Sequence, residues 1–232
     1  MPPTMDGIWS SITKLQTKLE NPLHQAEHEP DVQVVQPLHP FSVPFKQRFP
    51  ANQSLQLMVG GYSRLVSDRM ENGWSAYLVT FVFDHLRGPR ASVLDQMRDE
   101  ILRIYSTFVT RTHRKPRAVP TDQLPVLISV ADLPVAKSTP SNERTSCNGG
   151  FHFHAVLMVP RITRLKEHVA EHFKHQTDLY AGPSKLLAGI HVRPITGTPE
   201  RVVEYVFKTV LRGRVAYDDA VLVLPRASGE LD

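Results

Sequence analysis

Two histidines placed two residues apart are the first side chains in this sequence that could do chemistry. In the stretch GGFHFHAVLMVP, residues 149–160, His152 and His154 alternate with apolar residues. Successive side chains of a β-strand point to opposite faces, so the alternation predicts a strand with both imidazoles on one face. Two neutral imidazoles on one face can hold a divalent ion. The alternative is a pair of solvent-exposed histidines on an open sheet face.

A second group of reactive side chains falls on a predicted helix over residues 199–211. Thr198 suits the position that caps this helix, and Pro199 suits its first turn. Tyr205 and Lys208 are three residues apart, which places both on one face of the helix. A phenol is a weak nucleophile, and a neighbouring cation favours its reactive phenolate. The alternative is an ordinary amphipathic helix with a tyrosine at the sheet rim and a solvated lysine.

The pattern of the remaining chain predicts the elements that must position these side chains. Helices are expected over residues 52–73, 90–111, roughly 161–180 and 199–211, and strands over 74–86, 124–133, 149–160, 189–195 and 219–225. The loop between the second and third strands is too short for a crossover helix, so these strands should be antiparallel neighbours. The sequence therefore predicts an α+β domain with a mostly antiparallel central sheet and flanking helices.

The N-terminal part of the chain has a different character. Residues 21–50 contain six prolines and no helical periodicity, which indicates an extended tail or linker. We expect a flexible, proline-rich segment over residues 1–51 and one folded domain over residues 52–232. Residues 1–50 hold four Lys/Arg against five Asp/Glu, and the rest of the chain holds 23 against 18. The basic excess thus belongs to the predicted domain and favours a polyanionic partner.

Cysteine content and hydropathy restrict the compartment. Cys147 is the only cysteine, which excludes an intramolecular disulfide and a multi-cysteine metal site. No apolar run has the length of a signal peptide or of a transmembrane helix. We expect a cytoplasmic protein without a membrane partner.

Taken in order along the chain, these motifs resemble those of the HUH single-strand endonucleases. The histidine pair reads His-Phe-His at 152–154, and the helix reads Tyr-Val-Phe-Lys at 205–208. The strand AYLVTFVF is similar to the family's first motif, a hydrophobic strand with an embedded threonine. The segment GIHVRPITGTPERVVEYVFK resembles the family's approach to the tyrosine helix. The resemblance covers roughly residues 74–215 and is nearest to rolling-circle replication initiators of plasmids and single-stranded DNA phages.

This resemblance implies a metal-dependent nuclease. His152, His154 and a third side chain would hold Mg²⁺ or Mn²⁺, which would bind the scissile phosphate of single-stranded or hairpin origin DNA. Tyr205 would attack the phosphorus, form a 5′-phosphotyrosine and leave a 3′-OH for a polymerase, while Lys208 positions the phosphate or stabilises the phenolate. Attack by a 3′-OH would reverse the step without ATP. The sequence has no P-loop, so unwinding implies a host helicase, and extension implies a host polymerase.

The third metal ligand that the resemblance calls for is an acidic or polar residue on the strand beside the histidines. Asp132 is the only carboxylate on its face of the strand predicted over residues 124–133. Asp84, at the end of the strand predicted over residues 74–86, is the competing candidate. We favour Asp132 because its strand should neighbour the histidine strand. Its alternative role is to initiate the turn before a Leu-Pro pair.

Five exposed basic residues are candidates for contact with DNA phosphates. They are Arg114 and Lys115 in the run RTHRKPR, Arg161 and Arg164 after the histidine strand, and Arg212 after the tyrosine helix. A solvated surface is the alternative explanation for such residues.

Other functions fit parts of the pattern. A transposase or relaxase of the same superfamily and a non-catalytic single-stranded DNA-binding protein both remain open. Residues 168–172 also read H-x-x-E-H, the order found in inverted zinc peptidases. That enzyme would need a further glutamate on a downstream helix within an apolar core, and the sequence does not supply that core. We therefore assign residues 168–172 to a polar helix face.

Overall fold

The computed structural model describes residues 51–133, 147–182 and 185–226. The predicted N-terminal tail lies outside these residues except for its last position, so the predicted domain boundary stays a prediction. The chain divides into two units, and the second begins at Val59. Of the first unit, the described residues contain only the beginning of one helix. The sheet and the residues discussed below all belong to the second unit.

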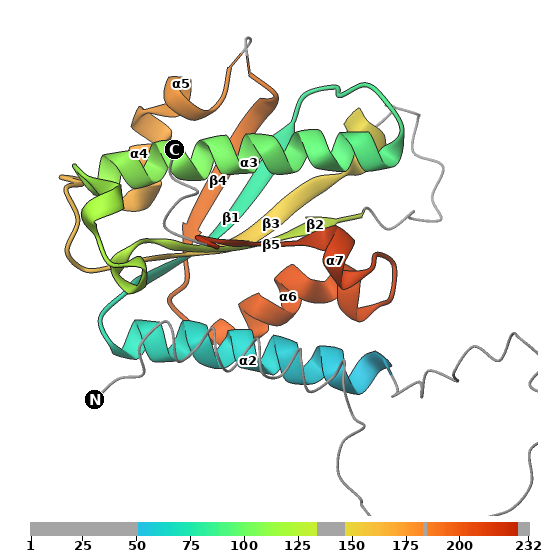
Figure 1. The fold of residues 1–232 in the computed structure, drawn as a ribbon, viewed down its shortest axis with the longest axis horizontal. Helices are drawn as coiled ribbons and strands as arrows, with labels where there is room; N and C mark the ends of the chain where they lie inside the picture. Colours follow the sequence, from blue (N-terminus) through green and yellow to red (C-terminus); the bar gives the residue numbers. More distant parts are fainter. Residues whose placement is uncertain (1–50, 134–146, 183–184, 227–232) are drawn as a thin grey trace, which may run out of the picture. The chain divides into compact units, whose positions relative to one another are not determined.

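The described residues form a five-stranded sheet in the order β4-β1-β3-β2-β5, with every neighbouring pair antiparallel. The strands are β1 (Ser75–Phe83), β2 (Val126–Asp132), β3 (His152–Val159), β4 (Leu187–Pro194) and β5 (Val221–Leu224). The histidine strand β3 is therefore central, and β2 is its antiparallel neighbour, as predicted. An α+β fold with an antiparallel sheet and flanking helices is confirmed (Figure 1).

Helices cover both faces of this sheet (Figure 1). They are α2 (Ala51–Glu71), α3 (Arg90–Thr112), α4 (Val169–His175), α5 (Thr177–Tyr180), α6 (Pro199–Leu211) and α7 (Tyr217–Ala220), with short 3₁₀ helices η1 (Pro116–Ala118), η2 (Thr121–Gln123) and η3 (Cys147–Gly150). Helices α3 and α4 pack on one face, where Phe108 and Phe173 stack with ring centroids 5.1 Å apart. Helix α6 lies against β2 and β3 on the other face.

The position of α6 follows from its apolar stripe. Val203, Phe207 and Val210 are buried, and their spacing places them on one side of the helix. The Phe207 ring stacks on Tyr62 of α2 at a centroid distance of 5.2 Å. Each such buried side chain contributes roughly 1.5–3 kcal/mol relative to an exposed one. This packing holds α6 over the centre of the sheet with the helix bounds that the sequence predicts.

The helix predicted over residues 161–180 is wrong in its first half. Helical structure begins only at Val169, and α4 and α5 are separated at Gln176. The Arg164 N–H donates to the Thr112 carbonyl at the end of α3, so this segment is held by a tertiary contact in a non-helical conformation. Ile162, which the periodicity would bury, is 85% exposed.

Within the described part of the chain, none of the helices is both long enough and apolar enough to cross a membrane.

Candidate metal and nucleophile site

The strand register brings three polar side chains and a threonine to one face of the sheet. Asp132 of β2 lies opposite His152 of β3, and Thr80 of β1 lies opposite His154. Residues directly opposite each other in an antiparallel pair project to the same face. Because His152 and His154 share a face by period 2, all four side chains meet beneath α6. The predicted pairing of β2 with β3 is what places Asp132 here.

Three donor atoms form a nearly equilateral triangle. The two Nε2 atoms of His152 and His154 are 3.1 Å apart, and Asp132 Oδ2 lies 3.2 Å and 3.3 Å from them. Ligand atoms about 3 Å apart are what metal bonds of about 2.1 Å and bond angles near 90° require. The residues therefore fit one divalent ion, bound on one side and open on the other. The geometry does not select Mg²⁺ over Mn²⁺.

The other ring nitrogens fix which atoms point at this triangle. His152 Nδ1–H donates to the Gly150 carbonyl at 3.0 Å, and His154 Nδ1 is 3.0 Å from Thr80 Oγ1. With the proton on Nδ1, each Nε2 carries the lone pair that binds a metal. Gly150 has a φ of 82°, which glycine adopts most readily, so the turn that aims its carbonyl depends on this residue. Thr80 is the embedded threonine of the first motif.

Asp132 is held as an ionised carboxylate. Burial raises its pKa, but hydrogen bonds from His152, His154, Lys208 and Thr209 outweigh burial and hold the pKa well below its usual range. Lys208 Nζ donates to Oδ2 at 2.6 Å, and Thr209 Oγ1 donates to Oδ1.

The two histidines differ in their affinity for protons. The hydrogen bond to Asp132 raises the pKa of His152 above its usual value, against an opposing effect of burial. Burial lowers the pKa of His154, although its hydrogen bond to Asp132 acts in the other direction. The His154 imidazole is thus held neutral, the form that can bind a metal.

Helix α6 brings the predicted nucleophile to the same place. The Tyr205 hydroxyl is 3.2 Å from His154 Nε2, and 44% of the residue is exposed to solvent. Lys208 Nζ lies 3.9 Å from the centroid of the Tyr205 ring. The ammonium therefore contacts the ring face and Asp132. The phenolic oxygen stands at the open side of the triangle, where a substrate can reach it.

Sequence reasoning missed Thr209. It lies in the buried stripe of α6, where a threonine looks like a small apolar residue. The signal available was a hydroxyl at a buried helix position next to Lys208, because a buried hydroxyl is costly unless it has a partner.

The structure separates the other predicted residues. Asp84 follows β1 and is exposed, outside the triangle that contains Asp132. Arg212 caps the C-terminus of α6, one turn beyond Lys208. The other candidates for DNA contact, Arg114, Lys115, Arg161 and Arg164, are exposed near the end of β3 that is remote from its histidines. Their contact with DNA stays a prediction.

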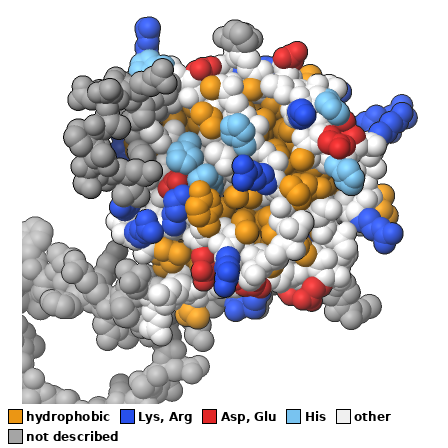
Figure 2. All heavy atoms as spheres, turned by 180° about the vertical axis from the view of Figure 1, so that it is seen from behind, with side chains coloured by type: hydrophobic (Ala, Val, Ile, Leu, Met, Phe, Trp, Pro, Cys, Tyr) orange, Lys and Arg blue, Asp and Glu red, His pale blue; other side chains and the backbone are white. Residues whose placement is uncertain are grey.

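The H-x-x-E-H residues do not converge. His168 and Glu171 are exposed, whereas His172 is buried and its Nε2 is 2.8 Å from the Tyr180 hydroxyl. The molecular face in Figure 2 carries several histidines among lysine, arginine and apolar side chains, so exposed histidines with basic neighbours are a general feature of this surface. Burial and mutual distance, rather than residue type, distinguish the triangle of Asp132, His152 and His154.

No protein-family model matches the sequence, and searches of curated proteins and of solved structures returned no match. The argument for a function therefore rests on the geometry and chemistry of the site.

Proposed function

We propose that this protein is a metal-dependent nuclease and strand transferase of the HUH type that acts on single-stranded DNA. One observation carries the proposal. Two imidazole nitrogens, a carboxylate oxygen and a phenolic oxygen, contributed by β2, β3 and α6, lie within 3.1–3.3 Å of a partner in the group. A metal site beside an exposed phenol is the combination that a tyrosine nucleophile needs.

Tyr205 is the nucleophile in this proposal. Its oxygen forms a bond to the phosphorus, and the bond from phosphorus to the 3′-oxygen of the preceding nucleotide breaks. The phenolic proton passes to water, which reaches this partly exposed side chain, and the departing 3′-oxygen takes a proton from water. The products are a 5′-phosphotyrosine and a free 3′-OH. Attack by a 3′-OH on the phosphotyrosine reverses the step and joins the strands.

The remaining side chains hold and balance charge. A divalent ion bound by His152, His154 and Asp132 would stabilise the negative charge that builds on the phosphate oxygens. Lys208 lies between the Tyr205 ring and Asp132, so its ammonium can pair with a phosphate oxygen. Thr209 orients Asp132, and Thr80 and the Gly150 carbonyl keep the two Nε2 atoms directed at the ion.

The order of the motifs along the chain supports a role in initiating rolling-circle replication of a plasmid or phage. The substrate is then single-stranded or hairpin origin DNA, and a host helicase and polymerase are the partners. The basic excess of the folded part of the chain suits such a substrate.

The test uses single-stranded oligonucleotides that cover the flanks of the protein's own gene, incubated with Mn²⁺ and separated on a denaturing gel. We expect cleavage and a covalent protein–DNA adduct, both lost in EDTA and in His152→Ala/His154→Ala. His168→Ala, which removes an exposed histidine, is the matched control and should keep full activity. Undiminished cleavage in EDTA or in the double variant would overturn the proposal. Binding of DNA without cleavage under all conditions would identify a non-catalytic binding protein.

A further inference from the structure

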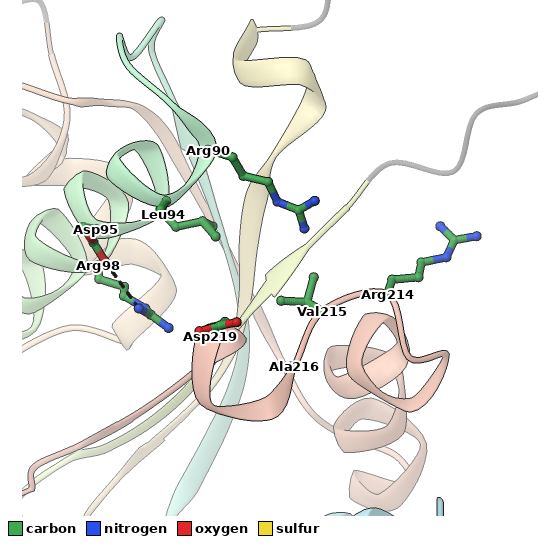
Figure 3. Close-up of a pocket in the computed structure, with 9 residues that line it drawn as sticks. Arg90, Leu94, Asp95, Arg98, Arg214, Val215, Ala216 and Asp219 are labelled. Carbon is green, nitrogen blue, oxygen red and sulfur yellow. Dashed lines mark hydrogen bonds and ion pairs between the residues drawn. The ribbon is translucent and has the colours of Figure 1, made fainter. Parts of the chain in front are cut away.

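A groove of about 590 Å³ opens between the first turn of α3 and the segment that joins α6 to α7 (Figure 3). Arg90 and Arg98 come from α3, and Arg214 and Asp219 come from the segment after α6. In Figure 3, Arg90 and Arg214 extend on either side of the end of β2. The volume lies within the roughly 300–1,000 Å³ that small-ligand sites occupy.

Two of the arginines in the groove are available for a ligand. Arg98 is already engaged, because it is 3.5 Å from Asp95 and donates to the Asp218 carbonyl at 3.0 Å. The Arg90 guanidinium lies over the Phe151 ring, a contact through its flat face that leaves its N–H groups at the edge free to donate. Arg214 is exposed, and no acceptor within the described residues holds its side chain.

The backbone of α3 adds to this positive potential. The helix is 23 residues long, and no side chain caps its first turn. The first N–H groups of a helix have no partner within it, and the helix dipole places partial positive charge there. An anion in the groove therefore meets backbone donors as well as the guanidinium groups.

Short contacts tie the groove to the metal and nucleophile site from two directions. The Arg214 N–H donates to the Thr209 carbonyl at 3.1 Å, and the Thr209 hydroxyl donates to Asp132. On the other side, Arg90 covers Phe151, the residue directly before His152. The groove is thus the nearest part of the described surface, by chain and contact, to the residues that hold both ends of the triangle.

We propose that this groove binds the phosphodiester backbone of single-stranded DNA next to the phosphate at the metal site. Arg90 and Arg214 each pair with one phosphate, since the guanidinium fork matches phosphate oxygens in two parallel hydrogen bonds. Asp219 faces the same groove and limits its net charge, so the contact depends on these two arginines. This assignment rests on the proposed function, because it takes the strand at the metal site to be DNA.

The test measures DNA binding as a function of salt. A fluorescent 20-nucleotide single strand is titrated by anisotropy with the Tyr205→Phe protein, which cannot cut it. The Arg90→Gln/Arg214→Gln change in that background should lower the slope of log affinity against log salt by about 1.4, since each lost phosphate contact on a single strand is worth about 0.7. The matched control, Arg64→Gln/Lys174→Gln, removes the same charge from exposed positions of α2 and α4 and should leave the slope unchanged.

Mn²⁺ binding by the groove variant, followed by electron paramagnetic resonance, should equal that of the parent protein and show that the triangle is intact. An unchanged slope in the groove variant, or an equal fall in the control, overturns the groove assignment. If the wild-type chain cuts DNA while the slope is unchanged, the groove assignment fails and the proposed function stands. If the groove variant loses slope as expected but the wild-type chain never cuts, the proposed function fails and the groove remains a DNA-binding surface.

Discussion

Replacing Lys208 with methionine should strengthen the binding of a divalent ion, because the lysine ammonium occupies the oxygen that the ion needs. Lys208 Nζ is 2.6 Å from Asp132 Oδ2, the oxygen that faces both histidine Nε2 atoms. An ion about 2.1 Å from the same oxygen would lie about 4 Å from the ammonium. At an effective dielectric constant of about 20, a double and a single charge at that distance repel by roughly 8 kcal/mol.

Repulsion of this size forces Lys208 to turn away when the ion binds. The ion then has to compensate only for the lost pair between Lys208 and Asp132, which for a partly exposed lysine is worth about 1–2 kcal/mol. Since about 1.4 kcal/mol is a factor of ten, Lys208→Met should tighten Mn²⁺ binding about tenfold. Methionine keeps much of the length and apolar stem of lysine, so packing against Tyr205 changes little.

The assay is a Mn²⁺ titration followed by the resonance signal of the free ion. Lys174→Met, at an exposed position of α4, is the matched control and should bind Mn²⁺ as the wild-type protein does. With saturating Mn²⁺, Lys208→Met should cut DNA more slowly, because a charge that can pair with the phosphate is gone. Equal or weaker Mn²⁺ binding in Lys208→Met would refute the argument that the ammonium and the ion compete for Asp132.

Three further outcomes follow from the same contacts. Asp132→Ala should weaken Mn²⁺ affinity about tenfold or more, whereas Asp84→Ala should leave it unchanged; the opposite ranking in a Mn²⁺ titration would transfer the ligand role to Asp84. Thr209→Val should lower the free energy of unfolding in urea by about 1–3 kcal/mol and weaken Mn²⁺ binding, and Thr209→Ser should restore both; a serine variant as poor as valine would contradict a hydroxyl role. Because Asp132 raises the pKa of His152 above 6.5, and its proton must leave before an ion binds, Mn²⁺ affinity should fall up to about tenfold per pH unit below that pKa and be constant above it; a flat profile down to about pH 5.5 would count against His152 as a ligand.

The parts of the fold that could be predicted are those governed by local periodicity. The alternation in β3 gave the shared face of His152 and His154, and the three-residue spacing gave the shared face of Tyr205 and Lys208. The short connection between β2 and β3 gave their antiparallel pairing, and with it the position of Asp132. Each of these inferences needs only strand or helix geometry and a loop length.

The rest depends on tertiary contacts that no local pattern contains. Thr209 acquires its role only when α6 packs over β2, and the Arg214 and Arg90 contacts require α3 and α6 to meet beside the end of the sheet. The segment over residues 161–168 has helical spacing, but its backbone is bonded to the end of α3. The basic runs were visible in the sequence, but their distance from the histidines was not, because it depends on which end of β3 they follow.

The identity of the residue that becomes linked to DNA tests the central claim most directly. All six tyrosines lie in the described part of the chain, and Tyr205 is the exposed one. Tyr62 and Tyr217 share a hydrogen bond of 2.5 Å, Tyr180 bonds to His172, and burial raises the pKa of Tyr62 and Tyr180 above the usual value for a phenol.

We therefore propose mass-spectrometric peptide mapping of the adduct trapped with a single-stranded oligonucleotide and Mn²⁺. The account predicts a nucleotide on the peptide that contains Tyr205, and no adduct in Tyr205→Phe, although that variant still binds DNA. A nucleotide on the peptide that contains Tyr180 or Tyr217, or an adduct that persists in Tyr205→Phe, would contradict it.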